Sequence, residues 1–129
     1  TWTSSKINKD FSDAKLKDIA NNIDDIHLQE NGAISIQGWA FIDGMDCKNQ
    51  KVYLNISDSK GNEAIYNTQS IKRKDVGDAF KSSIYNYSGF KALIPSETLE
   101  KGKIIIQIYI DNEGTIYQAS KNNDYTIEK

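Results

Sequence analysis

The segment 103–110 limits the possible folds of this chain more than any other segment. Its isoleucines occupy alternate positions, and alternate residues of an extended strand point to the same face. The isoleucines of this series are Ile104, Ile106, Ile108 and Ile110. The opposite face carries Ile105, Gln107 and Tyr109 and is largely apolar as well. We therefore expect a strand that is central in its sheet or covered on both sides.

Similar strand patterns recur along the chain at a spacing of about ten residues, with turn-forming residues between them. No long helical period separates these patterns. The expected strands are 22–28, 33–42, 51–57, 64–71, 88–94, 103–110, 115–120 and 125–128. The chain is therefore predicted to be all-β, an antiparallel β-sandwich of seven or eight strands with an Ig-like or jelly-roll-type arrangement.

The length of 129 residues fits a single domain. We expect the β-sandwich domain to span 22–129, and we predict that 1–21 is a linker or a first strand, because its apolar pattern is weak. A chain of this size buries roughly two-thirds of its unfolded surface, which is sufficient for one core.

Two short segments have the pattern of helical turns rather than strands. In 75–80, Asp75 is placed to cap the first turn and Phe80 to enter the core. The segment 95–99 would be a second such turn, anchored by Leu99.

The expected strand 33–42 changes its pattern at Gly38. Two isoleucines precede this glycine on the inner face, whereas Trp39 and Phe41 follow it on the opposite face. A glycine inside a strand indicates a bulge or a close approach of the backbone.

The charges of the chain nearly cancel, with 16 basic and 18 acidic side chains and a formal net charge of −2. Nucleic-acid binding is not expected, because phosphate neutralisation requires a basic excess or a basic stripe. The short basic run from Lys72 to Lys74 is followed by Asp75, which favours a solvated turn. No apolar run approaches the roughly twenty residues that span a membrane, so we expect no direct membrane insertion by this segment.

Cysteine usage and composition bear on the origin of the chain. Cys47 is the only cysteine, which excludes an internal disulfide and fits a cytosolic protein or a Gram-positive surface protein. Asn, Ile and Lys are abundant and Arg73 is the only arginine, which suggests an AT-rich bacterial genome. Because the chain starts at Thr1 without a methionine, we expect it to be part of a larger chain.

The sequence offers little catalytic chemistry. His27 is the only histidine, and its position between two apolar residues of an expected strand favours a solvent-facing side chain over a general base. Cys47 has a neighbouring lysine that favours the thiolate, but a half-buried loop cysteine is the preferred interpretation. One histidine and one cysteine cannot supply a tetrahedral zinc site, and the acidic turns at 43–46 and 58–63 do not follow the calcium-loop pattern. We predict no catalytic site, no metal and no cofactor.

Aromatic residues keep carbohydrate binding open as a hypothesis, because sugar rings pack their C–H faces on aromatic planes. Tyr85 and Tyr87 are expected to share a face just before the strand 88–94. Tyr109 and Tyr117 are expected to lie on neighbouring strands. The preferred interpretation is ordinary cross-strand packing, which stabilises any sheet.

Three short motifs together resemble a known family pattern. They are Gly38-Trp39-Ala40-Phe41, Arg73-Lys74-Asp75-Val76, and Ser88-Gly89-Phe90 followed by Ile94-Pro95. Over residues 22–118 the chain resembles a β-sandwich accessory module of bacterial cell-envelope proteins, notably membrane glycosyltransferases of surface-polysaccharide assembly. The resemblance implies an Ig-like sandwich on the extracellular face of a bacterial, Gram-positive envelope, outside any catalytic domain. It supplies neither a ligand nor catalytic residues.

Arg73 is the only arginine in a chain whose other basic residues are lysines, which suggests that it fills a position where lysine cannot replace it. Its planar guanidinium can bridge Asp75 and nearby carbonyls in a fixed geometry and hold the turn between Ile71 and Phe80. We expect Trp39 to be a core residue beneath this turn, and we prefer a structural role for the motif. If the region binds a ligand instead, the candidate residues are Trp39, Asp43, Arg73, Asp75, Tyr85 and Tyr87.

Three functions stay open, ranked in the following order. The first is a non-catalytic accessory module of a bacterial cell-surface or membrane protein, in contact with other domains of its parent or with a surface polysaccharide. The second is a dedicated carbohydrate-binding module, which requires a saturable aromatic surface. The third is a fragment of an enzyme, which requires an exposed cleft that contains His27 and two carboxylates.

Overall fold

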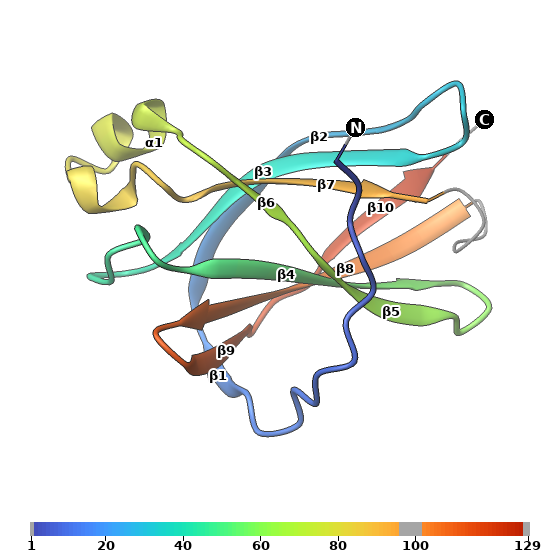
Figure 1. Ribbon diagram of the computed structural model, residues 1–129, viewed down its shortest axis with the longest axis horizontal. Coiled ribbons are helices and arrows are strands. Elements are labelled where there is room, and N and C mark those ends of the chain that lie inside the picture. The colour runs from blue at the N-terminus through green and yellow to red at the C-terminus, as the bar shows by residue number, and fades with distance from the viewer. Residues whose placement is uncertain (1, 96–101, 128–129) are drawn as a thin grey trace.

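The computed structural model describes residues 2–95 and 102–127, which form two β-sheets packed against each other (Figure 1). This part of the chain contains ten strands, one α-helix and one 3-10 helix. In chain order they are β1 (Lys15–Lys17), β2 (Ile19–Leu28), β3 (Ile34–Ile42), β4 (Lys51–Asp58), β5 (Glu63–Asn67), β6 (Gln69–Ile71), α1 (Lys74–Ala79), η1 (Ser83–Tyr85), β7 (Gly89–Ile94), β8 (Gly102–Asn112), β9 (Thr115–Ala119) and β10 (Asn123–Ile127). The prediction of an all-β sandwich is confirmed. Neither helix of these residues is long and apolar enough to cross a membrane.

The two sheets differ in size. The larger sheet has the order β1-β9-β8-β4-β5, with β10 also paired to β8, and the smaller sheet has the order β2-β3-β7-β6. β1 and β9 run parallel, whereas the other strand pairs of the described residues are antiparallel. The larger sheet is therefore mixed rather than purely antiparallel.

The number of strands exceeds the expected seven or eight for two reasons. The expected strand 64–71 is divided into β5 and β6, because the chain passes at Thr68 from the larger sheet to the smaller one. There the hydroxyl of Thr68 donates a hydrogen bond of 2.8 Å to the carbonyl oxygen of Val52. The segment 1–21 contains β1 and the start of β2, whose first residue, Ile19, is 4% exposed in the core.

β8 is the central strand of the larger sheet, as its sequence predicts. It pairs with β4 along one edge and with β9 and β10 along the other. The four even-numbered isoleucines of 104–110 are fully buried between the sheets. Tyr109, on the opposite face, is buried under the N-terminal segment.

β2 contains a bulge beside Gly38 of β3. The register of the two strands shifts between Ile23 and Asp25, which leaves Asp24 as the extra residue. A Cβ on Gly38 would lie 2.2 Å from the carbonyl oxygen of Asn22, so only glycine permits this approach. The close backbone approach expected at Gly38 is confirmed, and the bulge itself lies in the neighbouring strand.

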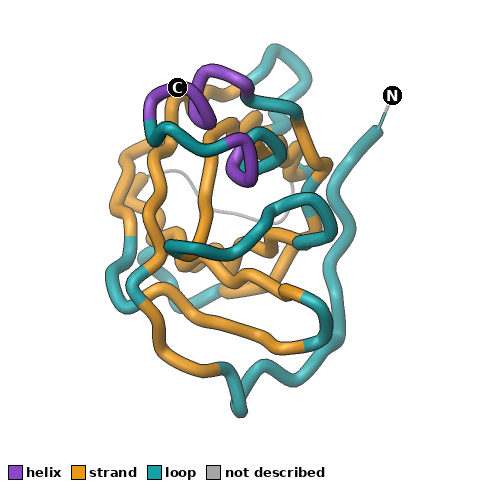
Figure 2. Tube along the Cα trace, turned by 90° about the vertical axis from the view of Figure 1, so that its left-hand side faces the viewer, coloured by secondary structure: helices purple, strands orange, loops and turns teal. Residues whose placement is uncertain are grey.

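The N-terminal segment before β1 runs as a long loop along one side of the sandwich (Figure 2). The backbone N–H of Ser4 donates a hydrogen bond of 2.9 Å to the carbonyl oxygen of Leu93 in the smaller sheet. Phe11 packs on the outer face of the larger sheet against Tyr53 and Tyr109, with ring centroids 5.4 and 4.9 Å away. The segment therefore contacts both sheets.

α1 and η1 lie in the long connection between β6 and β7. The residue at the N-cap of α1 is Arg73 and not the expected Asp75, whose carboxylate is held by the arginine side chain instead. Phe80 is 46% exposed, so the expectation that it enters the core is also wrong: it follows the last turn of a short helix whose buried side is formed by Val76. Apart from Pro95, the expected turn at 95–99 lies outside the described residues.

Candidate functional site

The connection, defined here as residues 72–88, packs on the outer face of the smaller sheet and forms a second apolar layer there. Both of its helices contribute, because one buried residue comes from α1 and another from η1. Trp39 packs against the border of this layer and is partly buried. The buried residues of the layer are Phe41, Cys47, Val76 and Tyr85.

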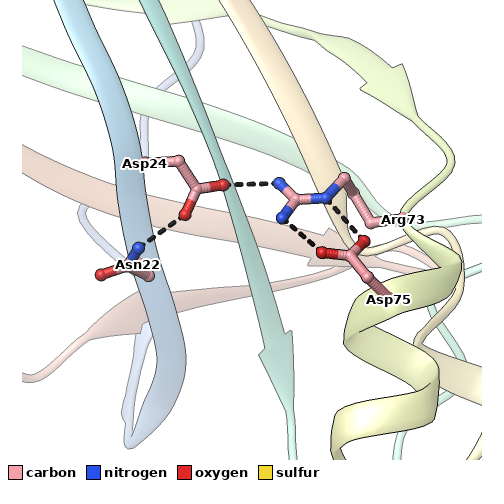
Figure 3. Close-up of polar contacts among 4 residues, drawn as sticks. All are labelled: Asn22, Asp24, Arg73 and Asp75. Atoms are coloured by element: carbon pink, nitrogen blue, oxygen red, sulfur yellow. Dashed lines mark hydrogen bonds and ion pairs between the residues drawn. The ribbon is translucent and has the colours of Figure 1, made fainter.

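An ion-paired network, which we call the clasp, joins the start of the connection to β2 (Figure 3). Its members are Asn22, Asp24, Arg73 and Asp75. The guanidinium of Arg73 donates to both carboxylate oxygens of Asp75, from Nε at 2.9 Å and from Nη2 at 2.8 Å. Its Nη1 donates to Asp24 Oδ2 at 2.5 Å, and Asn22 Nδ2 donates to the other oxygen of Asp24 at 2.6 Å. The arginine thus reaches across the sheet to its edge strand.

Two features of the backbone make room for the clasp. The bulge in β2 provides Asp24 as a second carboxylate partner for the arginine. At Gly89, a Cβ would lie 2.5 Å from Arg73 Cγ and 2.4 Å from the carbonyl oxygen of Ile71, so the absence of a side chain there lets the arginine pass. The predicted contact between Arg73 and Asp75 is present. The other side-chain partner of Arg73 is the carboxylate of Asp24 on β2, and not a backbone carbonyl as expected.

The pair of Arg73 and Asp75 keeps its charges over a wide pH range. Hydrogen bonds to Asp75 and then to Asp24 raise the pKa of Arg73 above its usual value, and the same contact with Arg73 lowers the pKa of Asp75. The side chains of Arg73, Asp24 and Asp75 are 25%, 33% and 67% exposed, so water screens the attraction. The main effect of the clasp is therefore to fix the position of the connection through the planar, bidentate geometry of arginine.

Four side chains form what we call the aromatic cluster beneath and beside α1. They are Trp39, Phe41, Phe80 and Tyr85. Phe41 stacks on Trp39 with ring centroids 5.6 Å apart and on Tyr85 with centroids 3.9 Å apart. Phe80 meets Trp39 and Phe41 edge-on at 5.4 and 4.9 Å, which is a favourable aromatic geometry.

All six candidate residues lie in the connection or contact the apolar layer that it forms on the smaller sheet. Arg73 and Asp75 belong to the clasp and Trp39 to the aromatic cluster. The hydroxyl of Tyr85 accepts a hydrogen bond from the backbone N–H of Gly44 at 2.7 Å and donates to Asp43 at 3.4 Å. Trp39 is only partly buried, contrary to the expectation of a core residue, because it points to the outer face of the smaller sheet.

Tyr85 and Tyr87 do not share a face, contrary to the prediction. Tyr85 is 6% exposed and stacks on Phe41, whereas Tyr87 is 42% exposed. The prediction assumed an extended chain, but η1 turns the backbone just before Tyr87. Tyr109 and Tyr117 do lie on the neighbouring strands β8 and β9, as expected, but they pack on opposite faces of the sheet.

Tyr87 borders a small hollow of about 80 Å³ near the place where β4 of the larger sheet meets β6 and β7 of the smaller one. We call it the Tyr87 hollow. Its lining residues are Gln50, Lys51, Val52, Thr68, Ser70, Tyr87 and Gly89. Most of this lining is polar, and none of it is a carboxylate. The ammonium of Lys72 lies 5.9 Å from the centroid of the Tyr87 ring.

Ser88 lies between Tyr87 and Gly89 in the sequence but is not itself a lining residue of the hollow. It is 0% exposed, and its Oγ has no hydrogen-bond partner among the described residues. The carbonyl oxygen of Ser88 accepts a bond from the N–H of Ala40, and the carbonyl oxygen of Ala40 accepts one from Nε2 of Gln50 at 2.9 Å. Gln50 and Ser88 could not be singled out from the sequence, because isolated polar residues at strand ends carry no periodic signal.

The residues considered for catalysis lie elsewhere. His27 is exposed on β2, as expected, with its Nδ1 2.7 Å from a carboxylate oxygen of Asp25. Cys47 is buried rather than half-buried, and its burial, together with the Asp46 carboxylate, raises the pKa of the thiol to about 12. The neighbouring lysine therefore does not favour the thiolate. Among residues 2–95 and 102–127, no group of three or more His, Cys, Asp and Glu side chains could hold a metal ion.

Comparison with other proteins adds no assignment: no protein-family model matches the chain, and no curated protein or solved structure is significantly similar to it. The functional argument therefore depends on the fold and on two surface regions, the connection and the Tyr87 hollow. Together they define the class of this protein as an all-β sandwich whose smaller sheet carries a clasped outer layer.

Proposed function

We propose that this chain is a non-catalytic accessory module of a larger bacterial cell-surface or membrane protein. In this proposal the module lies on the extracellular face of the envelope and docks on another domain of its parent chain. The three motifs that resemble the envelope module support this view, because their residues meet at the connection. Trp39 belongs to the aromatic cluster, Arg73 and Asp75 form the clasp, and Gly89 lets the arginine pass.

The exposed ring of Phe80 is the observation that carries the proposal. It is 46% exposed although it contacts three other aromatic rings. The backbone around it is held, since the N–H of Phe80 donates to Val76 at 3.0 Å and that of Ser82 donates to Gly77 at 2.9 Å. An aromatic ring held in place at the surface is typical of an interface anchor, because it loses little side-chain entropy on binding.

The surroundings of Phe80 fit the anatomy of a protein interface. Lys74 and Asp78 of α1 form an exposed ion pair at 3.1 Å and give the apolar ring a charged rim. Lys81 has a φ of 57°, in the left-handed region that non-glycine residues rarely adopt. Such conformations persist where the surrounding structure imposes them and cluster at functional sites.

Site-specific photo-cross-linking in the full-length natural protein tests this function. A photoreactive phenylalanine analogue at Phe80 is expected to form a cross-link to another domain of the same chain, which peptide mass spectrometry would locate. The matched control carries the analogue at Leu16 of β1, which is 69% exposed on the other sheet. Intramolecular cross-linking at position 80 that does not exceed the level at position 16 would contradict docking through this surface.

A further inference from the structure

We infer that the Tyr87 hollow is a carbohydrate subsite that takes the exocyclic hydroxymethyl group of a hexopyranose, with the sugar ring packed on Tyr87. This activity is independent of docking through Phe80, because Phe80 is not among the residues that line the hollow. The inference depends on three properties of the hollow, which are its size, its hydrogen-bonding groups and its exposed aromatic ring.

The size of the hollow selects the part of the sugar that enters it. A volume of about 80 Å³ corresponds to the share of two or three water molecules in the liquid. A whole pyranose ring is too large for this space, whereas one carbon with its hydroxyl fits. The ring itself must then lie at the mouth, where Tyr87 stands 42% exposed.

The hydrogen-bonding groups of the hollow suit a hydroxyl that both donates and accepts. Gln50 is 8% exposed, and the bond from its Nε2 to Ala40 fixes the amide plane and leaves Oε1 as an acceptor. Thr68 and Ser70, which carry hydroxyls, are lining residues, and the Thr68 hydroxyl, which donates to the carbonyl oxygen of Val52, can still accept a hydrogen bond.

The Tyr87 ring supplies the apolar part of the subsite. The ammonium of Lys72 lies 5.9 Å from the ring centroid, so the ring is accessible to polar groups from outside. Pyranose C–H bonds carry a partial positive charge and pack on the same electron-rich face. Lys72 is itself exposed and can move aside when a sugar arrives.

An NMR titration of the folded chain with matched trisaccharides tests the inference. Maltotriose, cellotriose and mannotriose carry the exocyclic hydroxymethyl group, whereas xylotriose has the same pyranose ring without it. We expect saturable amide shifts at Gln50, Ser70 and Tyr87 with at least one hexose trimer, and binding at least threefold weaker with xylotriose. A hexuronate trimer carries a carboxylate in place of the hydroxymethyl group, and it tests whether the hollow accepts that carboxylate beside Lys51. The inference is overturned if no hexose trimer shifts these residues, or if xylotriose binds equally well.

Variants separate the subsite from the fold and from docking. Y87A is expected to lower the affinity about tenfold through loss of the stacking face, and S70A to lower it two- to tenfold through loss of one hydrogen bond. Because Ser70 is exposed on β6, S70A should leave the melting temperature unchanged, which separates a lost contact from a lost fold. The control is F80A, since Phe80 is a ring of similar exposure that lies outside the hollow. Equal losses with Y87A and F80A would overturn the assignment, whereas sugar binding without cross-linking at Phe80 would leave it intact.

Discussion

The outer faces of the two sheets are both covered by irregular segments, but in different ways. On the larger sheet, the N-terminal segment buries Phe11 between Tyr53 and Tyr109, and all three rings are 6–7% exposed. On the smaller sheet, the connection buries Phe41 and Tyr85 but leaves Phe80 46% exposed. Trp2, at the start of the N-terminal segment, is also 39% exposed. The exposed ring of the connection is contacted by three other aromatic rings, so the connection presents a held aromatic ring at the surface.

The two covers also differ in how they are attached. The N-terminal segment is held by apolar packing and by backbone bonds such as that from Ser4 to Leu93. The connection is held in addition by the clasp, in which one arginine joins Asp24 and Asp75. Apolar contacts stabilise the folded state but depend little on orientation. The hydrogen bonds of the guanidinium fix the orientation of the connection but add little net stability. The predictions below test this division, from the largest expected effect to the smallest.

Among changes within the two covering segments themselves, Phe11→Ala is expected to have the largest effect on stability. Its ring is 7% exposed between two tyrosines, so truncation leaves a cavity and should destabilise the fold by about 3–5 kcal/mol. Urea unfolding followed by tryptophan fluorescence measures the change. A loss below about 1 kcal/mol would mean that the N-terminal segment contributes little to the folded state.

Gly89→Ala is expected to disturb the attachment of the connection. The added Cβ would lie 2.4 Å from the carbonyl oxygen of Ile71 and 2.5 Å from Arg73 Cγ, so the backbone or the arginine must shift. We expect a loss of about 2–3 kcal/mol, as for other overpacked sites. The control is Gly44→Ala, where nothing lies within 4 Å of the added atom and only the positive φ of 78° is strained. Equal losses at the two positions would contradict steric exclusion at Gly89.

Arg73→Lys tests whether the clasp acts through geometry or through charge. Lysine keeps the charge but cannot make the bidentate contact with Asp75, so we expect a stability loss of about 1 kcal/mol and faster hydrogen exchange at the amides of 74–88. Exchange should stay unchanged in β8, which lies in the other sheet. Unchanged exchange in both regions would show that the charge alone is sufficient.

Phe80→Ala is expected to change stability by less than about 1 kcal/mol, because its ring is already half exposed. The matched change Phe41→Ala, at a ring 3% exposed in the same cluster, should destabilise the fold by about 3–5 kcal/mol. Thermal unfolding of the two variants compares the rings directly. Similar losses would show that Phe80 is a structural residue and would remove the basis for docking.

The pH dependence of the clasp gives the smallest effect. The Arg73 contact lowers the pKa of Asp75 in the folded state, so this stabilisation is present above the unfolded value of about 3.9 and is lost as the pH falls through the lower folded value. Asp75→Asn lacks the titrating group and should lose less stability between neutral pH and this acid range than the parent does. Urea midpoints at neutral pH and at about pH 3 measure the difference, and parallel losses would contradict the assignment.

Much of the main core could be predicted from local pattern. The alternation in 103–110 fixes which side of β8 is buried, because a strand has a period of two whatever it pairs with. The solvent-facing position of His27 and the close approach at Gly38 follow from the same periodicity. The prediction that Phe80 enters the core was wrong, because the exposure of Phe80 depends on how α1 buries Val76. No local sequence pattern encodes this packing.

The candidate site could be predicted only in part. The lone arginine and its neighbour Asp75 are visible in the sequence, since they stand two residues apart and form a bidentate pair. Asp24 lies 49 positions from Arg73, and only the bulge in β2 brings the two together. The Tyr87 hollow likewise joins residues from three separate stretches of the chain, 50–52, 68–70 and 87–89, so no single stretch of sequence contains it.

The sequence by itself therefore determined that this protein is a β-sandwich, because the alternation of apolar and polar residues is a local property of each strand. It also determined that Arg73 would pair with Asp75. Only the tertiary structure decided which rings are covered, where the chain changes sheets at Thr68, and that Gln50 and Tyr87 line one hollow. The physical reason is that burial and hydrogen-bond satisfaction depend on neighbours that are distant in sequence, and these are set only when the sheets pack.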